Sequence, residues 1–203
     1  MKKISIFLIA IFSLTNIFGQ SSLEGDVNVF NPITTGVPFL SIAPDARGGA
    51  MGDVGAATSP DAYSQYWNPS KFAFIDGAGG VSLSYTPWLR KLVKDIDLAY
   101  LSGYYKIADI QTVSASLRYF SLGEVMIRKD ATSPAITAKP YDLAVDASYA
   151  RILAENFSMG VTLRFIYSDL LGGAPVEEAE SLTPGAAVAA DISAFYSSPV
   201  VFP

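Results

Sequence analysis

The stretch that decides the fold is residues 156–168, NFSMGVTLRFIYS, in which apolar side chains alternate with small or polar ones. The apolar set is Phe157, Met159, Val161, Leu163, Phe165 and Tyr167, and the positions between hold Ser158, Gly160, Thr162, Arg164 and Ser168. Only a β-strand points alternate residues to opposite faces, so this segment predicts a two-faced strand. The same alternation recurs in residues 111–120 and 141–150.

Six segments of this kind lie between Gly79 and Tyr196. The strands expected from them are residues 79–86, 95–106, 111–120, 141–153, 156–168 and 185–196. Most are long enough to cross a bilayer at a tilt, which takes roughly 9 to 11 residues. The turns at 108–109 and 154–155 are short, whereas the connections 121–140 and 169–184 are long, as at the two ends of an outer-membrane barrel. We therefore predict an all-β fold, a transmembrane antiparallel β-barrel.

Aromatic residues gather near the ends of these strands. They are Tyr85, Tyr104, Tyr105, Tyr119, Phe120, Tyr141, Phe157, Tyr167, Phe195 and Tyr196. Aromatic girdles at two membrane interfaces produce this distribution, although aromatic residues also favour strands in any β-protein.

The amino-acid composition argues against several classes of function. The 203 residues are 50% hydrophobic and 16% charged, with a net charge of −5 and no basic cluster, which argues against nucleic acid as a partner. Cysteine and histidine are both absent, so the chain has no disulfide, no thiolate nucleophile and no imidazole base or ligand.

The N-terminus resembles a secretory leader. Lys2 and Lys3 precede an apolar stretch, residues 4–18, and Gly19 is a small residue at the expected cleavage point. We predict a signal peptide over residues 1–19, with an anchor helix as the alternative. Export combined with alternating strands predicts the outer membrane of a Gram-negative bacterium.

Residues 20–78 are irregular and rich in turn-forming residues, and we interpret them as a plug or insert ahead of the strands of residues 79–203. The expected structural motif residues are Gly48, Gly49, Gly52, Asp53, Asn68 and Pro69. Short helical turns are expected in residues 45–51 or 60–66, with Ser59 or Asp61 as an N-cap.

Charged side chains sit on the small and polar face of the strands, which we expect to line the barrel lumen. They are Asp97, Arg118, Asp142, Asp146, Arg164 and Asp191. A charge facing lipid costs ~2–4 kcal/mol for Arg at the midplane, whereas a polar lumen tolerates it. We expect Asp142 and Asp146 to pair with Arg118 or Arg164. A soluble sandwich with this face in water is the alternative.

The sequence gives little support for an enzymatic function. There is no Gly-x-Ser-x-Gly elbow, and Asp142 and Asp146 lie about 13 Å apart by strand rise, too far for an acid/base pair. Glu177, Glu178 and Glu180 form a solvated loop more readily than a calcium site. The sequence predicts a non-enzymatic protein without metal or cofactor.

Two stretches carry a family resemblance. Residues 46–62, ARGGAMGDVGAATSPDA, and the following YWNPS of residues 66–70 resemble the plug signature of FadL-like outer-membrane barrels, with Ser70 in place of the usual Ala. The longer run of residues 31–47, with LSYTPWLR at 83–90 and LRYFSLG at 117–123, is similar to the PorV family of the Bacteroidetes type IX secretion system.

The PorV resemblance implies a barrel of about fourteen strands with no small-molecule chemistry. It implies association with the secretion translocon, receipt of sorting-domain cargo proteins and delivery to a PorU-like sortase, with the long connections 121–140 and 169–184 as our expected cargo contacts. The alternative function is a FadL-like transporter of hydrophobic small molecules. The sequence holds only six expected strands, so we predict an incomplete barrel corresponding to the N-terminal half of the family chain.

Overall fold

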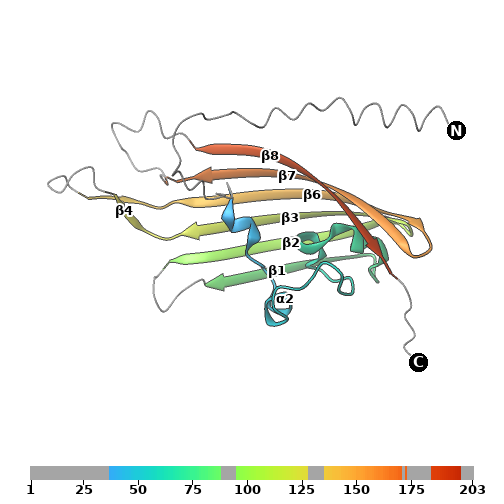
Figure 1. The fold of residues 1–203 in the computed structure, drawn as a ribbon. Helices are drawn as coiled ribbons and strands as arrows, with labels where there is room; N and C mark the ends of the chain where they lie inside the picture. The colour runs from blue at the N-terminus through green and yellow to red at the C-terminus, as the bar shows by residue number, and fades with distance from the viewer. Residues whose placement is uncertain (1–36, 88–94, 128–134, 171, 173–183, 198–203) are drawn as a thin grey trace, which may run out of the picture. The chain divides into compact units, whose positions relative to one another are not determined.

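The computed structural model describes residues 37–87, 95–127, 135–170, 172 and 184–197 (Figure 1). The chain divides into two compact units, residues 1–36 and 37–203, and all described residues belong to the second. The expected signal peptide lies outside the described residues.

Six antiparallel strands form one sheet in the order β1-β2-β3-β6-β7-β8. They are β1 (Gly79–Pro87), β2 (Ile96–Ala108), β3 (Gln111–Leu122), β6 (Tyr141–Ala154), β7 (Phe157–Asp169) and β8 (Gly185–Tyr196). All six expected strands are confirmed. The described sheet is open, because β1 pairs only with β2 and β8 only with β7. Closure into a barrel remains a prediction.

A second, two-stranded sheet lies within the connection from β3 to β6. It pairs β4 (Val125–Ile127) with β5 (Ile136–Ala138), within a stretch that the sequence predicts to be a long connection without strands. Strands of three residues are too short for alternation to be recognised.

The segment before β1 contains four short helices: η1 (Pro38–Ser41), α2 (Ala46–Ala50), α3 (Ser64–Trp67) and η2 (Pro69–Phe74). Two of them fall in or next to the expected helical turns. The expected caps were wrong, because α3 starts after Tyr63 without a side-chain cap, and Asp61 instead accepts from the N–H of Tyr63 at 3.1 Å. None of the described helices is long and apolar enough to span a membrane.

This N-terminal segment covers one face of the sheet, where η2 packs against β3, β6, β7 and β8 and α3 packs against β3. On the covered face the buried side chains are mostly polar, and Thr162 is only 2% exposed. On the opposite face the side chains are apolar and open, and neighbouring Leu163 is 60% exposed. The two faces therefore reverse the arrangement of a soluble sheet, in which apolar side chains are buried.

Candidate functional site

The covered face carries a line of ionic contacts across three strands. Arg164 on β7 donates from Nε to Asp146 Oδ1 on β6 at 2.6 Å, and its Nη1 lies 3.4 Å from Asp191 Oδ2 on β8. Ser116 Oγ on β3 donates to the other oxygen of Asp146 at 3.1 Å. The structure therefore brings Asp146, Arg164 and Asp191 together, and the expected pairing of Asp146 with Arg164 is present.

Arg118 is buried on the same face but pairs with no carboxylate among its described contacts. Its Nη1 donates to the main-chain carbonyls of Phe39, at 3.2 Å, and Leu40, at 2.9 Å. The guanidinium lies 4.6 Å from the ring centre of Tyr66 and 5.3 Å from that of Tyr100. Arg118 thus holds η1 against the sheet, a role that the expected pairing did not include.

Asp142 also differs from the expected pairing. Its Oδ1 accepts from the hydroxyl of Ser168 on β7, and no ion pair involves it among the described contacts.

Asp97 lies on the face opposite to the one that the sequence predicts for it. Burial along β2 shows that Leu98, Tyr100 and Ser102 are covered, so Asp97 belongs to the opposite, apolar face. There it accepts a hydrogen bond from the Tyr85 hydroxyl at 2.7 Å. The first residues of β2 are apolar on both faces, which hides the alternation that assigned the other five charges.

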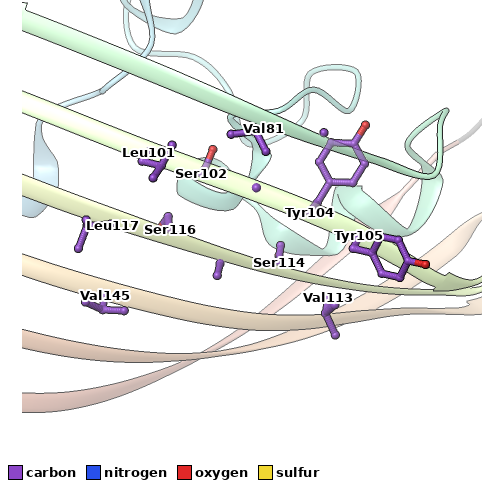
Figure 2. A pocket seen from close by; sticks show the side chains of 13 residues that line it. Val81, Leu101, Ser102, Tyr104, Tyr105, Val113, Ser114, Ser116, Leu117 and Val145 are labelled. Atoms are coloured by element: carbon purple, nitrogen blue, oxygen red, sulfur yellow. The ribbon is translucent and has the colours of Figure 1, made fainter.

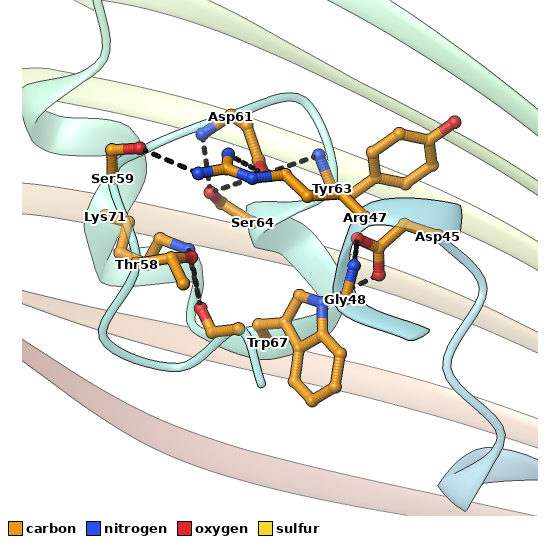
Figure 3. A network of polar contacts seen from close by, with 11 residues as sticks. Asp45, Arg47, Gly48, Thr58, Ser59, Asp61, Tyr63, Ser64, Trp67 and Lys71 are labelled. Carbon is orange, nitrogen blue, oxygen red and sulfur yellow. Dashed lines mark hydrogen bonds and ion pairs between the residues drawn. The ribbon is translucent and has the colours of Figure 1, made fainter. Parts of the chain in front are cut away.

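The backbone at Gly48 and Gly55 packs closely against the indole ring of Trp67 (Figure 3). Asp45 accepts from the N–H of Gly48 at 2.7 Å and from Trp67 Nε1 at 2.8 Å. A Cβ on Gly48 would lie 2.7 Å from the indole, and one on Gly55 only 2.2 Å from it. The two glycines therefore allow the backbone to pack directly on the ring.

The other glycine-motif residues serve the turn that follows α2. Gly52 and Asp53 have φ of 79° and 61°, in the left-handed region, so they reverse the chain here. A Cβ on Gly49 would meet no atom within 4 Å, so its lack of a side chain serves no packing purpose in the described residues.

The Asn-Pro motif fixes the segment to the sheet. Asn68 caps η2 by accepting from the N–H of Ser70, and Pro69 occupies the first turn, where its missing N–H costs nothing. The Asn68 amide also donates to the carbonyl of Ala194 on β8 at 3.0 Å.

Two further buried residues of the N-terminal segment, Gln65 and Lys71, make contacts that the sequence does not predict. Gln65 bridges two strands, accepting from Ser114 Oγ at 2.6 Å and donating to Ser148 Oγ at 2.7 Å. Lys71 is fully buried and donates from Nζ to Gly55 O at 2.7 Å and Thr58 Oγ1 at 3.1 Å (Figure 3). Burial lowers the pKa of the Lys71 ammonium from its ordinary value. Neither residue belongs to a recognisable motif, since only the tertiary contacts give it a partner.

An apolar groove of about 620 Å³ lies on the exposed face (Figure 2). Its floor contains Gly103 and Ala115, which face each other across β2 and β3, and larger side chains such as Leu101, Leu117 and Tyr105 flank them.

These features can be set beside known protein families. A sequence model of the family described as Type IX secretion system protein PorV matches residues 26–202. The chain belongs to the PorV family. The predicted resemblance is therefore confirmed, and PorV membership makes the chain a component of the type IX secretion system. A search of curated protein sequences found no match.

PorV proteins are secretion components that are not known as enzymes. In this PorV-family chain, the described residues contain no group of three or more His, Cys, Asp or Glu side chains that could hold a metal ion. Partners within the secretion machinery follow from membership of the family.

Proposed function

We propose that this chain is an outer-membrane component of the type IX system, in which the sheet forms part of a barrel wall. The apolar face contacts lipid, and residues 37–78 act as a plug in the lumen. The end of the sheet at which β3 and β7 finish, which we call the loop end, binds sorting-domain cargo at the translocon. The cargo then passes to the surface attachment machinery, including a PorU-like sortase. The observation that carries this proposal is the reversed distribution of polar and apolar side chains on the two faces.

The height of the apolar face supports contact with a membrane. The face is bounded by Asp97 and Asp169 at the loop end and Arg151 at the turn end, and its described residues between these levels carry no charge. On β6, residues 141 and 151 mark these two levels and are about 33 Å apart at ~3.3 Å per residue. A strand tilt of about 40° reduces this length to ~25 Å, the height of the apolar band of outer-membrane barrels.

Tyrosines mark the loop-end border of this band. The Tyr119 and Tyr141 rings are 5.8 Å apart, and the Tyr141 and Tyr167 rings are 6.1 Å apart, while Tyr85 continues the row on β1. Rows of aromatic side chains at the interface are typical of outer-membrane strands.

The five remaining expected charges, Arg118, Asp142, Asp146, Arg164 and Asp191, lie on the sheet face that we assign to the lumen. Their polar contacts, which reach residues 37–78, each other or, for Asp142, Ser168, support that assignment, because a charge in a barrel needs polar partners or water.

The alternative, a FadL-like transporter of hydrophobic small molecules, is less well supported. It calls for an apolar pocket beside the plug. The cavity there, about 610 Å³, has polar side chains such as Asp45, Asp53 and Ser84 in its lining.

The test is complementation of a type IX-secreting bacterium that lacks its own PorV. The chain, expressed with its leader, is assayed for folding by heat-modifiable gel mobility and for bound proteins by affinity capture. The proposal expects a folded species that co-purifies with sorting-domain proteins. A folded species that captures none, beside a capturing family member, would refute the proposed partners.

A further inference from the structure

The floor of the apolar groove on the exposed face lacks side-chain bulk (Figure 2). Gly103 on β2 lies opposite Ala115 on β3, and the groove of about 620 Å³ lies over this pair. Leu117 flanks the groove on the side nearer the loop end, and Tyr105 flanks it on the side nearer the turn end, where β2 and β6 finish. The groove is therefore a depression in the face that we assign to lipid.

The lack of a side chain at Gly103 is required neither by its backbone nor by its neighbours in the described part of the chain. Gly103 is not among the described glycines with positive φ, and the register between β2 and β3 is regular here, with its shift only after Lys106. A Cβ on Gly103 would lie 3.4 Å from the carbonyl oxygen of Gly80, which is an ordinary contact. Gly160 on β7 differs, because a Cβ there would lie 2.8 Å from Ser193 Oγ. Glycine weakens the interior of a strand, so a glycine that the fold does not require indicates the close approach of a ligand.

A single cation on the described part of this face borders the groove at the turn end. Arg151 on β6 is exposed, and it is the diagonal cross-strand neighbour of Val113, which lines the groove. Diagonal neighbours are ~7–8 Å apart, within reach of a long side chain. The Arg151 side chain makes no hydrogen bond or ion pair with the described residues. Its guanidinium is therefore available to an external anion, and its fork of N–H donors matches a phosphate.

The groove and Arg151 together match the depth of one membrane leaflet. Val145 lines the groove six residues before Arg151 on β6, which is ~20 Å at ~3.3 Å per residue. A strand tilt of about 40° reduces this length to ~15 Å along the membrane normal. That depth is half of the roughly 30 Å hydrocarbon core.

We propose that the groove and Arg151 form a binding site for one phospholipid of the leaflet at the turn end. An acyl chain lies over Gly103 and Ala115, and the lipid phosphate accepts hydrogen bonds from Arg151. The uncharged groove suits a hydrocarbon chain, and the cation at its border suits the one anionic group that every phospholipid carries at that depth. This inference rests on the proposed function, since it requires the apolar face to contact a membrane.

Retention of phospholipid by the folded chain tests the groove. The chain and its variants are folded in phosphatidylglycerol vesicles and extracted in mild detergent, and native mass spectrometry counts the phospholipid that remains bound. Ala115→Leu fills the floor of the groove. Ala190→Leu is the matched control, because Ala190 on β8 lies on the same face and at the same level, through the register of β3, β6, β7 and β8, but outside the groove. We expect the parent chain and Ala190→Leu to retain one phospholipid, and Ala115→Leu to retain at least fivefold less. Equal retention by the two variants overturns the groove as the site.

A second measurement tests the contact with phosphate. The folded chain in detergent is titrated with phosphatidylglycerol and with diacylglycerol of the same acyl chains, which lacks the phosphate. Arg151→Gln is expected to weaken phosphatidylglycerol binding at least fivefold and to leave diacylglycerol binding unchanged, whereas Arg151→Lys should keep the preference of the parent chain. An equal effect of Arg151→Gln on both lipids, or an effect on neither, overturns the role of Arg151.

The folding readout separates this inference from the proposed function. A parent chain that gains no heat-modifiable form in vesicles refutes the proposed membrane location and the lipid site with it. A parent chain that folds but retains no phospholipid refutes the lipid site alone. If Ala115→Leu loses a co-purified protein while phospholipid retention is unchanged, the occupant of the groove is a protein and the proposal is overturned.

Discussion

The same strands form both faces of the sheet, but the side chains of the two faces have opposite polarity and different surroundings. On the covered face, buried polar side chains find partners in the N-terminal segment, as when Thr112 donates to the carbonyl of Phe72 and Ser158 to that of Ser70. On the exposed face, Leu83 and Ile192 are more than 70% exposed and lack such cover.

This difference shows which interactions stabilise each face. Buried polar groups cost free energy unless they are hydrogen-bonded, so the covered face depends on the contacts made by residues 37–78. Exposing the apolar side chains of the other face to water costs free energy, so that face is stable only in contact with another apolar medium. The sheet therefore has one polar, covered face and one apolar, exposed face, and a charged substitution should be costly on the apolar face whereas the loss of a charge should be costly on the polar face.

The largest effect is expected on the covered face. Asp146→Leu leaves Arg164 with only Asp191, which is half exposed, so we expect a loss of about 3 kcal/mol in folding free energy. Urea titration of folding in lipid vesicles measures this loss.

Two variants sharpen that result. Asp146→Leu combined with Arg164→Leu should recover most of the stability, because a buried pair can be replaced by apolar residues with little cost. Glu124→Gln breaks an exposed pair and should change stability by less than about 1 kcal/mol. A double variant as unstable as Asp146→Leu would contradict this account of the pair.

The next effect belongs to the apolar face. Leu117→Arg places a charge midway along β3, and we expect it to destabilise the folded chain in vesicles by about 2–4 kcal/mol. Leu153→Arg is the control, because it lies beyond Arg151 at the turn end of β6 and should cost ~0–1 kcal/mol. Equal, small effects at both positions would mean that the face is in water.

A smaller effect is expected within residues 37–78. Gly55→Ala forces a methyl group into the Trp67 indole, and overpacking of this kind costs about 1–3 kcal/mol. Gly49→Ala, in α2, has open space and should be neutral or stabilise slightly. Resistance of residues 37–78 to protease measures both, and equal resistance of the two variants would show that the indole can move away.

The smallest effect is a pH dependence. Burial lowers the pKa of Lys71 from 10.5, so in a window just below pH 10.5 the unfolded chain binds more protons than the folded one. Stability should therefore rise with pH across that window in the parent chain, and rise less in Lys71→Met. The urea midpoint is measured at several pH values for both chains, and parallel curves would contradict the assignment.

The sequence predicted the strands well because alternation over ten or more residues records which face each side chain occupies. The same alternation assigned Arg118, Asp142, Asp146, Arg164 and Asp191 to one face. It failed for Asp97, where both faces are apolar, and for β4 and β5, which are too short. Gln65 and Lys71 were unpredictable from the sequence because their partners are distant serine, threonine and main-chain groups with no sequence signature.

The most direct test of the central claim is the environment of Leu163, on the apolar face of β7. Leu163→Cys gives the chain a single thiol, which can carry a spin label in the folded protein in lipid vesicles. The account predicts that the label collides readily with oxygen and is shielded from a water-soluble nickel chelate, unlike a label at Leu153→Cys. Equal access of the nickel chelate to both positions would contradict a lipid-facing sheet.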